Sequence, residues 1–118
     1  MIRYVHCIKA RPEVSGPEFR RLFHGKEMES LIARLADLTE AVDYKLSLTL
    51  EIQLNLRLME ERGGASPFDA LVEMRWTSGR ALMPHLESDA LRSLMDDLET
   101  FQETFVDFSR SSRFFVEE

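Results

Sequence analysis

Three side chains near the N-terminus could carry acid–base chemistry: His6, His24 and Glu27. His6 alternates with Tyr4 and Ile8 in a segment rich in aromatic and β-branched residues, so it lies on one apolar face of a predicted strand. An imidazole within a mostly apolar pocket would be a useful base near neutral pH. The alternative is a core histidine with a backbone partner. Both interpretations stay open.

Glu27 follows Gly25 and lies one helical turn after Phe23 and one turn before Leu31. Both apolar neighbours should be buried, so we expect the carboxylate to point towards a sheet-facing pocket, partly desolvated as a general acid or base requires. The alternative is an ordinary exposed helix glutamate. His24 and Glu27, at i and i+3, could share a metal ion, but a site needs three or four ligands, and we predict none.

The composition argues against several classes of partner. The formal net charge is −6 with a pI near 5.1, and the basic residues are scattered among acidic ones, which excludes a nucleic-acid footprint. No segment approaches the ~20 consecutive apolar residues of a membrane helix. Cys7 is the only cysteine and no signal-peptide pattern is present, so we predict a cytoplasmic protein. The chain lacks a glycine-rich phosphate loop and a nucleophile elbow, which disfavours nucleotide-dependent and standard hydrolase chemistry.

The elements that must position these side chains have the order βαββαβ. We predict strands at 1–10, 45–58, 68–76 and 113–116, and helices at about 16–38 and 78–101. Ser15 and Glu18 have the form of a capping box at the start of the first helix. The apolar stripe of that helix changes direction across Gly25, which predicts a kink or break there. A length of 118 residues with 44% hydrophobic content predicts one α+β domain, residues 1–118.

Residues 45–58 carry the clearest periodic pattern in the chain. Every second position is apolar: Leu46, Leu48, Leu50, Ile52, Leu54, Leu56 and Leu58. This alternation predicts one long strand that projects beyond its own sheet. Because the helices would cover only one face of the sheet, we expect a second copy to cover the other face and form a homodimer.

Three segments resemble the EthD family. The matching residues are Glu18, Phe19 and Phe23 after Arg11–Ser15, the run Phe68–Trp76 followed by Ser78, and Phe105–Asp107 with Ser109–Glu118. Residues 40–66 have no match. The resemblance implies a ferredoxin-like βαββαβ sandwich that pairs into a dimeric α+β barrel. Family members often carry a histidine where this chain has Glu27, so the role of that histidine does not transfer.

What the resemblance implies for function is a pocket between sheet and helices for a small apolar or aromatic molecule, with no bound cofactor. We expect Tyr4, Phe19, Phe23, Leu31 and Trp76 to line it, and Tyr4 could donate its hydroxyl to a ligand carbonyl. The first hypothesis is a cofactor-independent enzyme of lyase, cyclase or oxygenase type. The alternative is a non-catalytic binding or accessory protein of an oxygenase-linked degradation pathway. Haem binding is disfavoured because no histidine is clearly placed as an axial ligand.

The two hypotheses predict different structures. An enzyme should have a closed pocket with at least one imidazole or carboxylate pointing in, because proton transfer requires such a group next to the substrate. An accessory protein should lack such a group and have an exposed apolar patch instead.

Overall fold

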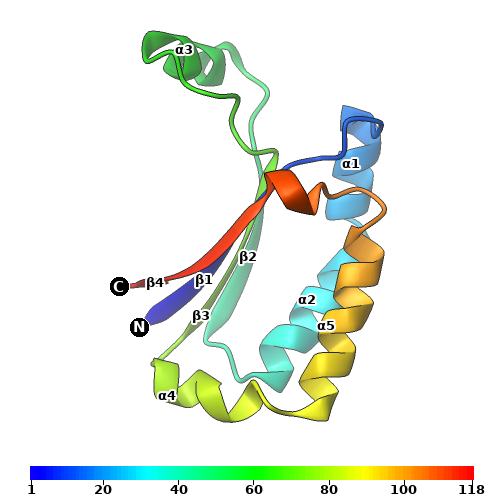
Figure 1. Ribbon diagram of the computed structural model, residues 1–118, viewed down its shortest axis with the longest axis vertical. Helices are drawn as coiled ribbons and strands as arrows, with labels where there is room; N and C mark the ends of the chain where they lie inside the picture. Colours follow the sequence, from blue (N-terminus) through cyan, green and yellow to red (C-terminus); the bar gives the residue numbers. More distant parts are fainter.

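The computed structural model describes all 118 residues and contains one four-stranded antiparallel sheet (Figure 1). The strands are β1 (Ile2–Ile8), β2 (Asp43–Leu48), β3 (Ala70–Trp76) and β4 (Ser112–Glu117). The helices are α1 (Gly16–Phe23), α2 (Lys26–Leu38), α3 (Gln53–Glu61), α4 (Gly79–Leu82) and α5 (Asp89–Gln102), with 3-10 turns η1 (Met83–His85) and η2 (Phe108–Arg110). The strand order β2-β3-β1-β4 gives the ferredoxin-like α+β topology, which confirms the predicted fold class.

The ends of the helices follow the local signals in the sequence. The Ser15 hydroxyl accepts a hydrogen bond from the Glu18 amide at 3.2 Å, and Ser88 caps α5 in the same way. Between α1 and α2, a Cβ atom on Gly25 would lie 2.9 Å from the Arg21 carbonyl oxygen, so a side chain there would clash with the backbone. The predicted break at Gly25 is confirmed.

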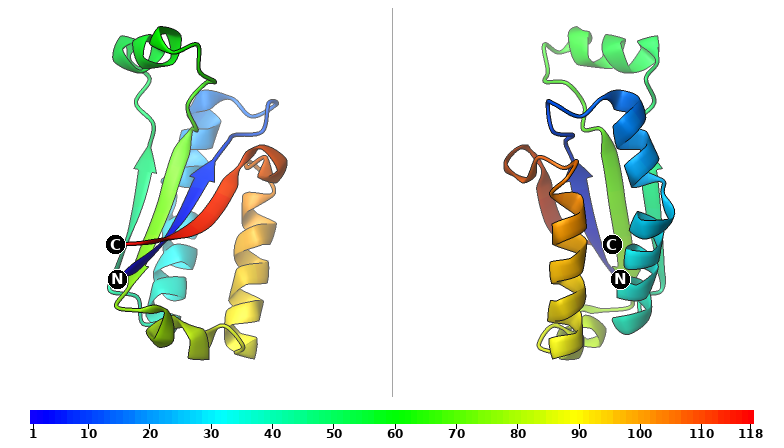
Figure 2. Two further views of the ribbon diagram at one scale, coloured as in Figure 1. Left: turned by 60° about the vertical axis from the view of Figure 1, so that its left-hand side comes forward. Right: turned by 90° about the vertical axis from the view of Figure 1, so that its right-hand side faces the viewer.

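The core lies between the sheet and the layer formed by α1, α2 and α5, which cover the same face of the sheet (Figure 2). Along β3 every second residue is buried, because alternate side chains of a strand point to the same face. The largest fully buried side chains are Ile8, Phe23, Met28, Ile32, Val72, Met74, Phe105 and Val106. Fold stability therefore rests on this single contact between sheet and helices.

The predicted long strand at 45–58 is wrong. β2 ends at Leu48, which is paired with Ala70, the first residue of β3. The chain beyond Leu48 therefore has no neighbouring strand, and a helix is the structure that satisfies its backbone groups internally. Residues Gln53–Glu61 form α3, which projects past the end of the sheet and away from α1, α2 and α5 (Figure 1).

The face of the sheet opposite the helices is covered by no other element (Figures 1 and 2). By strand alternation this outer face carries the apolar side chains Val5, Leu71, Phe114 and Val116, and Phe114 is 46% exposed. It also carries ion pairs between neighbouring strands: Arg3 with Glu73 at 2.9 Å, and Arg75 with Asp43. No helix of the chain has both the length and the apolar character needed to cross a membrane.

Candidate functional site

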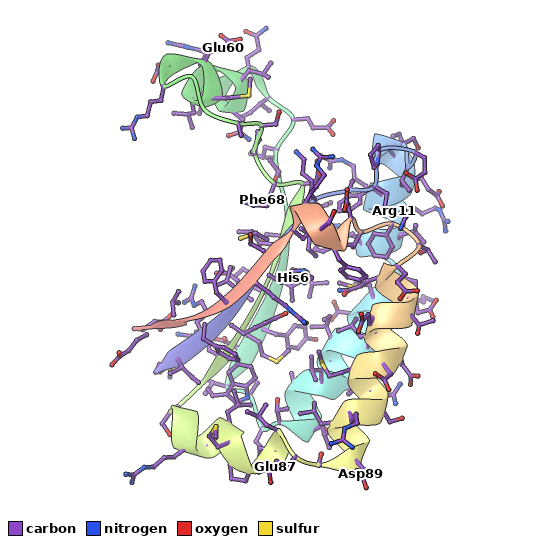
Figure 3. All side chains as sticks on the ribbon, viewed as in Figure 1. His6, Arg11, Glu60, Phe68, Glu87 and Asp89 are labelled. Atoms are coloured by element: carbon purple, nitrogen blue, oxygen red, sulfur yellow. The ribbon has the colours of Figure 1, made fainter.

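The centre of the candidate site is His6, on β1 in the interior of the sheet. Its neighbours across the strands are Val72 on β3 and Arg113 on β4. The side chain points to the face that α2 and α5 cover, as Figure 3 shows, and the residue is only 6% exposed. Of the three histidines, only His85 forms a side-chain hydrogen bond, to Glu40. The His6 imidazole is therefore buried and has no hydrogen-bond partner within the chain.

His6 borders a cavity of about 370 Å³ between the sheet, α2 and α5. This volume lies within the usual range of small-molecule sites, roughly 300–1,000 Å³. The apolar part of the lining includes Leu35, Val72, Met74, Trp76, Leu91, Met95, Leu98 and Phe115. The polar part includes Tyr4, His6, Thr39, Glu99, Gln102, Ser111 and Arg113. An apolar cavity with a few convergent polar groups is typical of a binding site for a small organic molecule.

Burial controls the ionisation of the two titratable rings in this pocket. Desolvation lowers the pKa of His6 to about 4, and the positive charge of Arg113 adds to the effect. His6 is therefore neutral near pH 7, with a nitrogen lone pair available to accept a proton. Desolvation raises the pKa of Tyr4, while the charge of Arg113 acts in the opposite direction. Tyr4 therefore keeps its phenolic proton and can donate it in a hydrogen bond.

Part of the pocket wall is aromatic, and its Trp76 ring is held by hydrogen bonds. Trp76 Nε1 donates to both the Thr39 carbonyl and the Thr39 hydroxyl at 3.2 Å, which holds the indole in place. The Phe115 ring lies 6.2 Å from the Trp76 ring and 5.5 Å from the Tyr4 ring, measured between ring centres. Such tilted aromatic pairs are stable arrangements that leave ring faces available for a flat ligand.

No cluster of three or more His, Cys, Asp or Glu side chains is arranged to hold a metal ion. The groups that the chain itself brings to the pocket are a neutral imidazole, a phenol, a guanidinium and amide and hydroxyl groups. Together these groups can remove a proton from a bound molecule and stabilise negative charge on its oxygen.

Solved structures with the same fold include three informative neighbours. An EthD family protein from Bacillus halodurans has a TM-score of 0.62, with 15% identity over 100% of this chain and 98% of that one. A mutant of SnoaB, a cofactor-independent oxygenase from Streptomyces nogalater, has a TM-score of 0.55, with 13% identity over 99% and 91%. A conserved protein from Methanosarcina mazei has a TM-score of 0.56, with 20% identity over 99% and 91%.

The chain has the fold of these proteins. The resemblance to an EthD-type protein, first based on short motifs, is therefore confirmed for the fold. Neither the family models nor the curated proteins include a match to this sequence.

Three of the predicted site residues do line the pocket: His6, Tyr4 and Trp76. The structure does not place Phe19, Phe23 and Leu31 there; all three are buried in the core and are absent from the pocket lining. Phe19 and Phe23 belong to α1, which packs over one end of the sheet, whereas the pocket is formed by α2 and α5 at a different part of it.

The prediction that Glu27 points into the pocket is wrong, and His24 lies outside the pocket as well. Both side chains are exposed. The prediction treated Phe23, Glu27 and Leu31 as one continuous helical face, but the chain breaks at Gly25, so Phe23 belongs to a different helix. Within α2 the buried face is centred on Met28 and Ile32, more than a quarter turn from Glu27 at roughly 100° per residue.

Sequence reasoning missed most of the polar residues of the pocket, among them Arg113 and Gln102. Gln102 is 4% exposed at the end of α5, and Arg113 lies beside His6 in the sheet register. The sequence did contain one signal for Arg113: it alternates with Phe115 and so shares a face with an aromatic residue. What the sequence lacked was the register of the β1–β4 pair, which places Arg113 opposite His6.

A second hollow of about 590 Å³ lies between α1, α3 and the segments on either side of α3. Its basic side chains already have partners within the chain. Arg20 donates to the Thr49 carbonyl at 3.1 Å and lies 3.8 Å from the Glu51 carboxylate, and Lys9 donates to the Pro67 carbonyl at 3.1 Å. No buried, unpartnered group points into this hollow, so the His6 pocket is the better candidate.

Proposed function

We propose that the pocket around His6 binds a small apolar or aromatic molecule and that the protein is a cofactor-independent enzyme of lyase, cyclase or oxygenase type. The observation that carries the proposal is the state of His6: nearly buried, neutral and without a hydrogen-bond partner, beside a mostly apolar cavity. A buried polar group normally has a partner, so an unpartnered one facing a cavity supports a role towards a ligand.

His6 would act as a base that takes a proton from an acidic C–H or O–H bond of the bound molecule. The protonated imidazole is disfavoured in the empty pocket, because desolvation and Arg113 both oppose its charge. A negative charge that forms on the substrate would stabilise the imidazolium directly. Proton transfer would therefore be coupled to formation of the substrate anion, which Tyr4 could stabilise with a hydrogen bond from its hydroxyl.

The test is a comparison of wild type with His6→Gln and His24→Gln on a panel of aromatic compounds with enolic or phenolic groups. Oxygen uptake would reveal an oxygenase, and mass spectrometry would reveal loss of water or ring closure. General base catalysis typically contributes about 10²–10⁴-fold, so His6→Gln should lose turnover by that factor. His24→Gln, which changes an exposed histidine, should behave as wild type. Equal turnover by His6→Gln would reject the assignment.

The proposed assembly is a homodimer in which two copies pack through their outer sheet faces. Two observations support it: the outer face carries Val5, Leu71 and Phe114 with no covering element, and α3 extends past the end of its own sheet. A second copy placed on that face would bury it, and α3 could then reach the partner. Light scattering after gel filtration should give twice the chain mass of 13.7 kDa at micromolar concentration. The single-chain mass would overturn the assembly.

A second candidate function is that of a non-catalytic accessory protein, and one observation favours it. The arm, which we define as residues 49–68, presents an exposed apolar surface of the kind expected for such a protein. Its exposed large apolar side chains are Leu50, Ile52, Leu54, Leu56, Leu58 and Phe68. Compounds that bind without turnover, with affinity that survives His6→Gln, would favour the accessory function over the enzyme.

A further inference from the structure

We infer that the ligand of the His6 pocket is an apolar molecule with one anionic oxygen group, a carboxylate or phenolate, and that Arg113 binds this group beside His6. The inference rests on the proposed function, since it assigns a ligand class to the same pocket. Its starting point is that Arg113 is the only arginine or lysine in the pocket lining.

Arg113 has no acidic partner within the chain. Six other arginines form ion pairs: Arg3, Arg11, Arg20, Arg21, Arg75 and Arg92. Arg113, an exposed residue of the edge strand β4, forms none, although it borders a cavity whose lining is mostly apolar. A guanidinium presents several N–H donors in a plane that matches an oxygen anion, so an unpaired one at a cavity is suited to hold such a group.

The strand register fixes where that anion would lie. Arg113 is directly opposite His6 in the β1–β4 ladder, and Phe115 is opposite Tyr4, so these four side chains share the helix-facing side of the sheet. The charge of Arg113 is close enough to affect the ionisation of both His6 and Tyr4. An oxygen bound by Arg113 would therefore lie next to the imidazole and the phenol.

The other polar groups of the pocket are compatible with this orientation. Glu99 on α5 is the only acidic side chain in the lining, and it is exposed and forms no ion pair with Arg113. It would repel an anion from the α5 side and favour the position near β4. Gln102, which is nearly buried, offers a neutral amide to the cavity.

The apolar part of the ligand would occupy the rest of the cavity, between α2 and α5. Leu35, Met95 and Leu98 line this part, together with the aromatic wall of Trp76 and Phe115. These side chains offer no hydrogen bond to a second polar group of the ligand, apart from the Trp76 N–H, which Thr39 already occupies. The pocket therefore selects a molecule with one acidic end and an apolar body.

The experiment is calorimetric titration with two probes of the same shape: 2-naphthoate, which is anionic, and 2-naphthalenemethanol, which is neutral. Wild type should bind naphthoate more tightly. Arg113→Gln should weaken naphthoate binding about tenfold and leave the neutral probe within about twofold, since a hydrogen bond to a charged group contributes on that scale. Arg34→Gln, which removes an exposed, unpaired arginine on α2, is the charge-matched control and should bind both probes as wild type does.

Two further titrations complete the experiment. Arg113→Lys keeps the charge and should retain part of the preference for naphthoate even if Arg113→Gln folds poorly. A nitrophenol, titrated at a pH where it is ionised, distinguishes phenolate from carboxylate. Equal binding of naphthoate and naphthalenemethanol by wild type would overturn the anion inference and leave the pocket proposal standing. Failure of every probe to bind would overturn both.

Discussion

The pocket region and the arm are both rich in large apolar side chains, but they differ in what buries those side chains. In the pocket region, α2, α5 and the sheet bury one another, and buried groups such as Trp76 Nε1 have hydrogen-bond partners. In the arm, α3 has no buried residue and no side-chain cap, and Leu54 and Leu58 are 57% and 58% exposed. Figure 3 shows Glu60 at the far end of the arm and Phe68 where the arm rejoins the sheet.

This difference shows which part of the molecule is self-sufficient. Isolated helices shorter than about 12–15 residues are marginal in water, because most helical stability in proteins comes from packing of an apolar face. α3 has nine residues, and none of them is buried by the rest of the chain. The pocket region can therefore be ordered by itself, whereas the order of the arm depends on a surface outside the chain. The proposed second copy would supply that surface.

The largest expected effect is on the stability of the core. Phe23→Ala should lower the free energy of unfolding by about 3–5 kcal/mol, because Phe23 is fully buried and its removal leaves a cavity. Leu56→Ala in the arm should change it by less than about 0.5 kcal/mol under dilute conditions where single chains dominate. Denaturant unfolding of both variants measures the contrast. Equal losses would mean that the arm belongs to the same cooperative unit as the core.

The next effect is the pH dependence caused by His6. Its pKa is about 4 in the folded protein and about 6.5 in an unfolded chain, so below pH 6.5 the unfolded state binds a proton that the folded state does not. Above pH 6.5 the ionisation of His6 does not reduce the free energy of unfolding. As the pH is lowered from 6.5 to 5, the free energy of unfolding falls by about 2 kcal/mol. Denaturant unfolding midpoints measured at a series of pH values test this prediction. His6→Leu should flatten this part of the curve, and His24→Gln should not.

A smaller effect is expected on self-association through the arm. The double substitution Leu54→Lys with Leu58→Lys should weaken the proposed dimer at least tenfold, or about 1.4 kcal/mol, because it places two charges on the apolar surface that would contact the second copy. Met83→Lys is the control, since Met83 is 63% exposed but lies on η1, outside both the arm and the outer sheet face. Sedimentation equilibrium measures the dimer dissociation constant of the wild type, the double variant and Met83→Lys. An unchanged dissociation constant would remove the arm from the interface.

The smallest effect concerns the helix caps. Ser88→Ala should lower stability by about 1 kcal/mol, because the Ser88 hydroxyl accepts the Leu91 amide at 3.0 Å. Ile52→Ser would give α3 the side-chain cap that it lacks, yet the free energy of global unfolding should not change. Thermal and denaturant unfolding measure the stability of both variants relative to the wild type. A clear stabilisation by Ile52→Ser would show that α3 unfolds together with the core.

The sequence predicted those parts of the fold and site that depend on short-range interactions. The cap at Ser15 and the break at Gly25 involve residues within one helical turn, and both are confirmed. The end of β2 depends instead on where β3 begins, and that information is not contained in residues 45–58. The prediction of the orientation of Glu27 failed for a related reason, because the break between α1 and α2 changed which residues share a helical face.

The same difference between short-range and long-range interactions decided which parts of the pocket could be predicted. Strand alternation alone placed His6 on an apolar face with Tyr4, because successive side chains of any strand point to opposite sides. Only the tertiary structure decided the register of the β1–β4 pair, which brings Arg113, near the C-terminal end of the chain, beside His6. It also decided that α2 and α5 enclose the imidazole and keep it neutral. Alternation is a local property of the backbone, whereas strand pairing and desolvation depend on residues that are distant in the sequence.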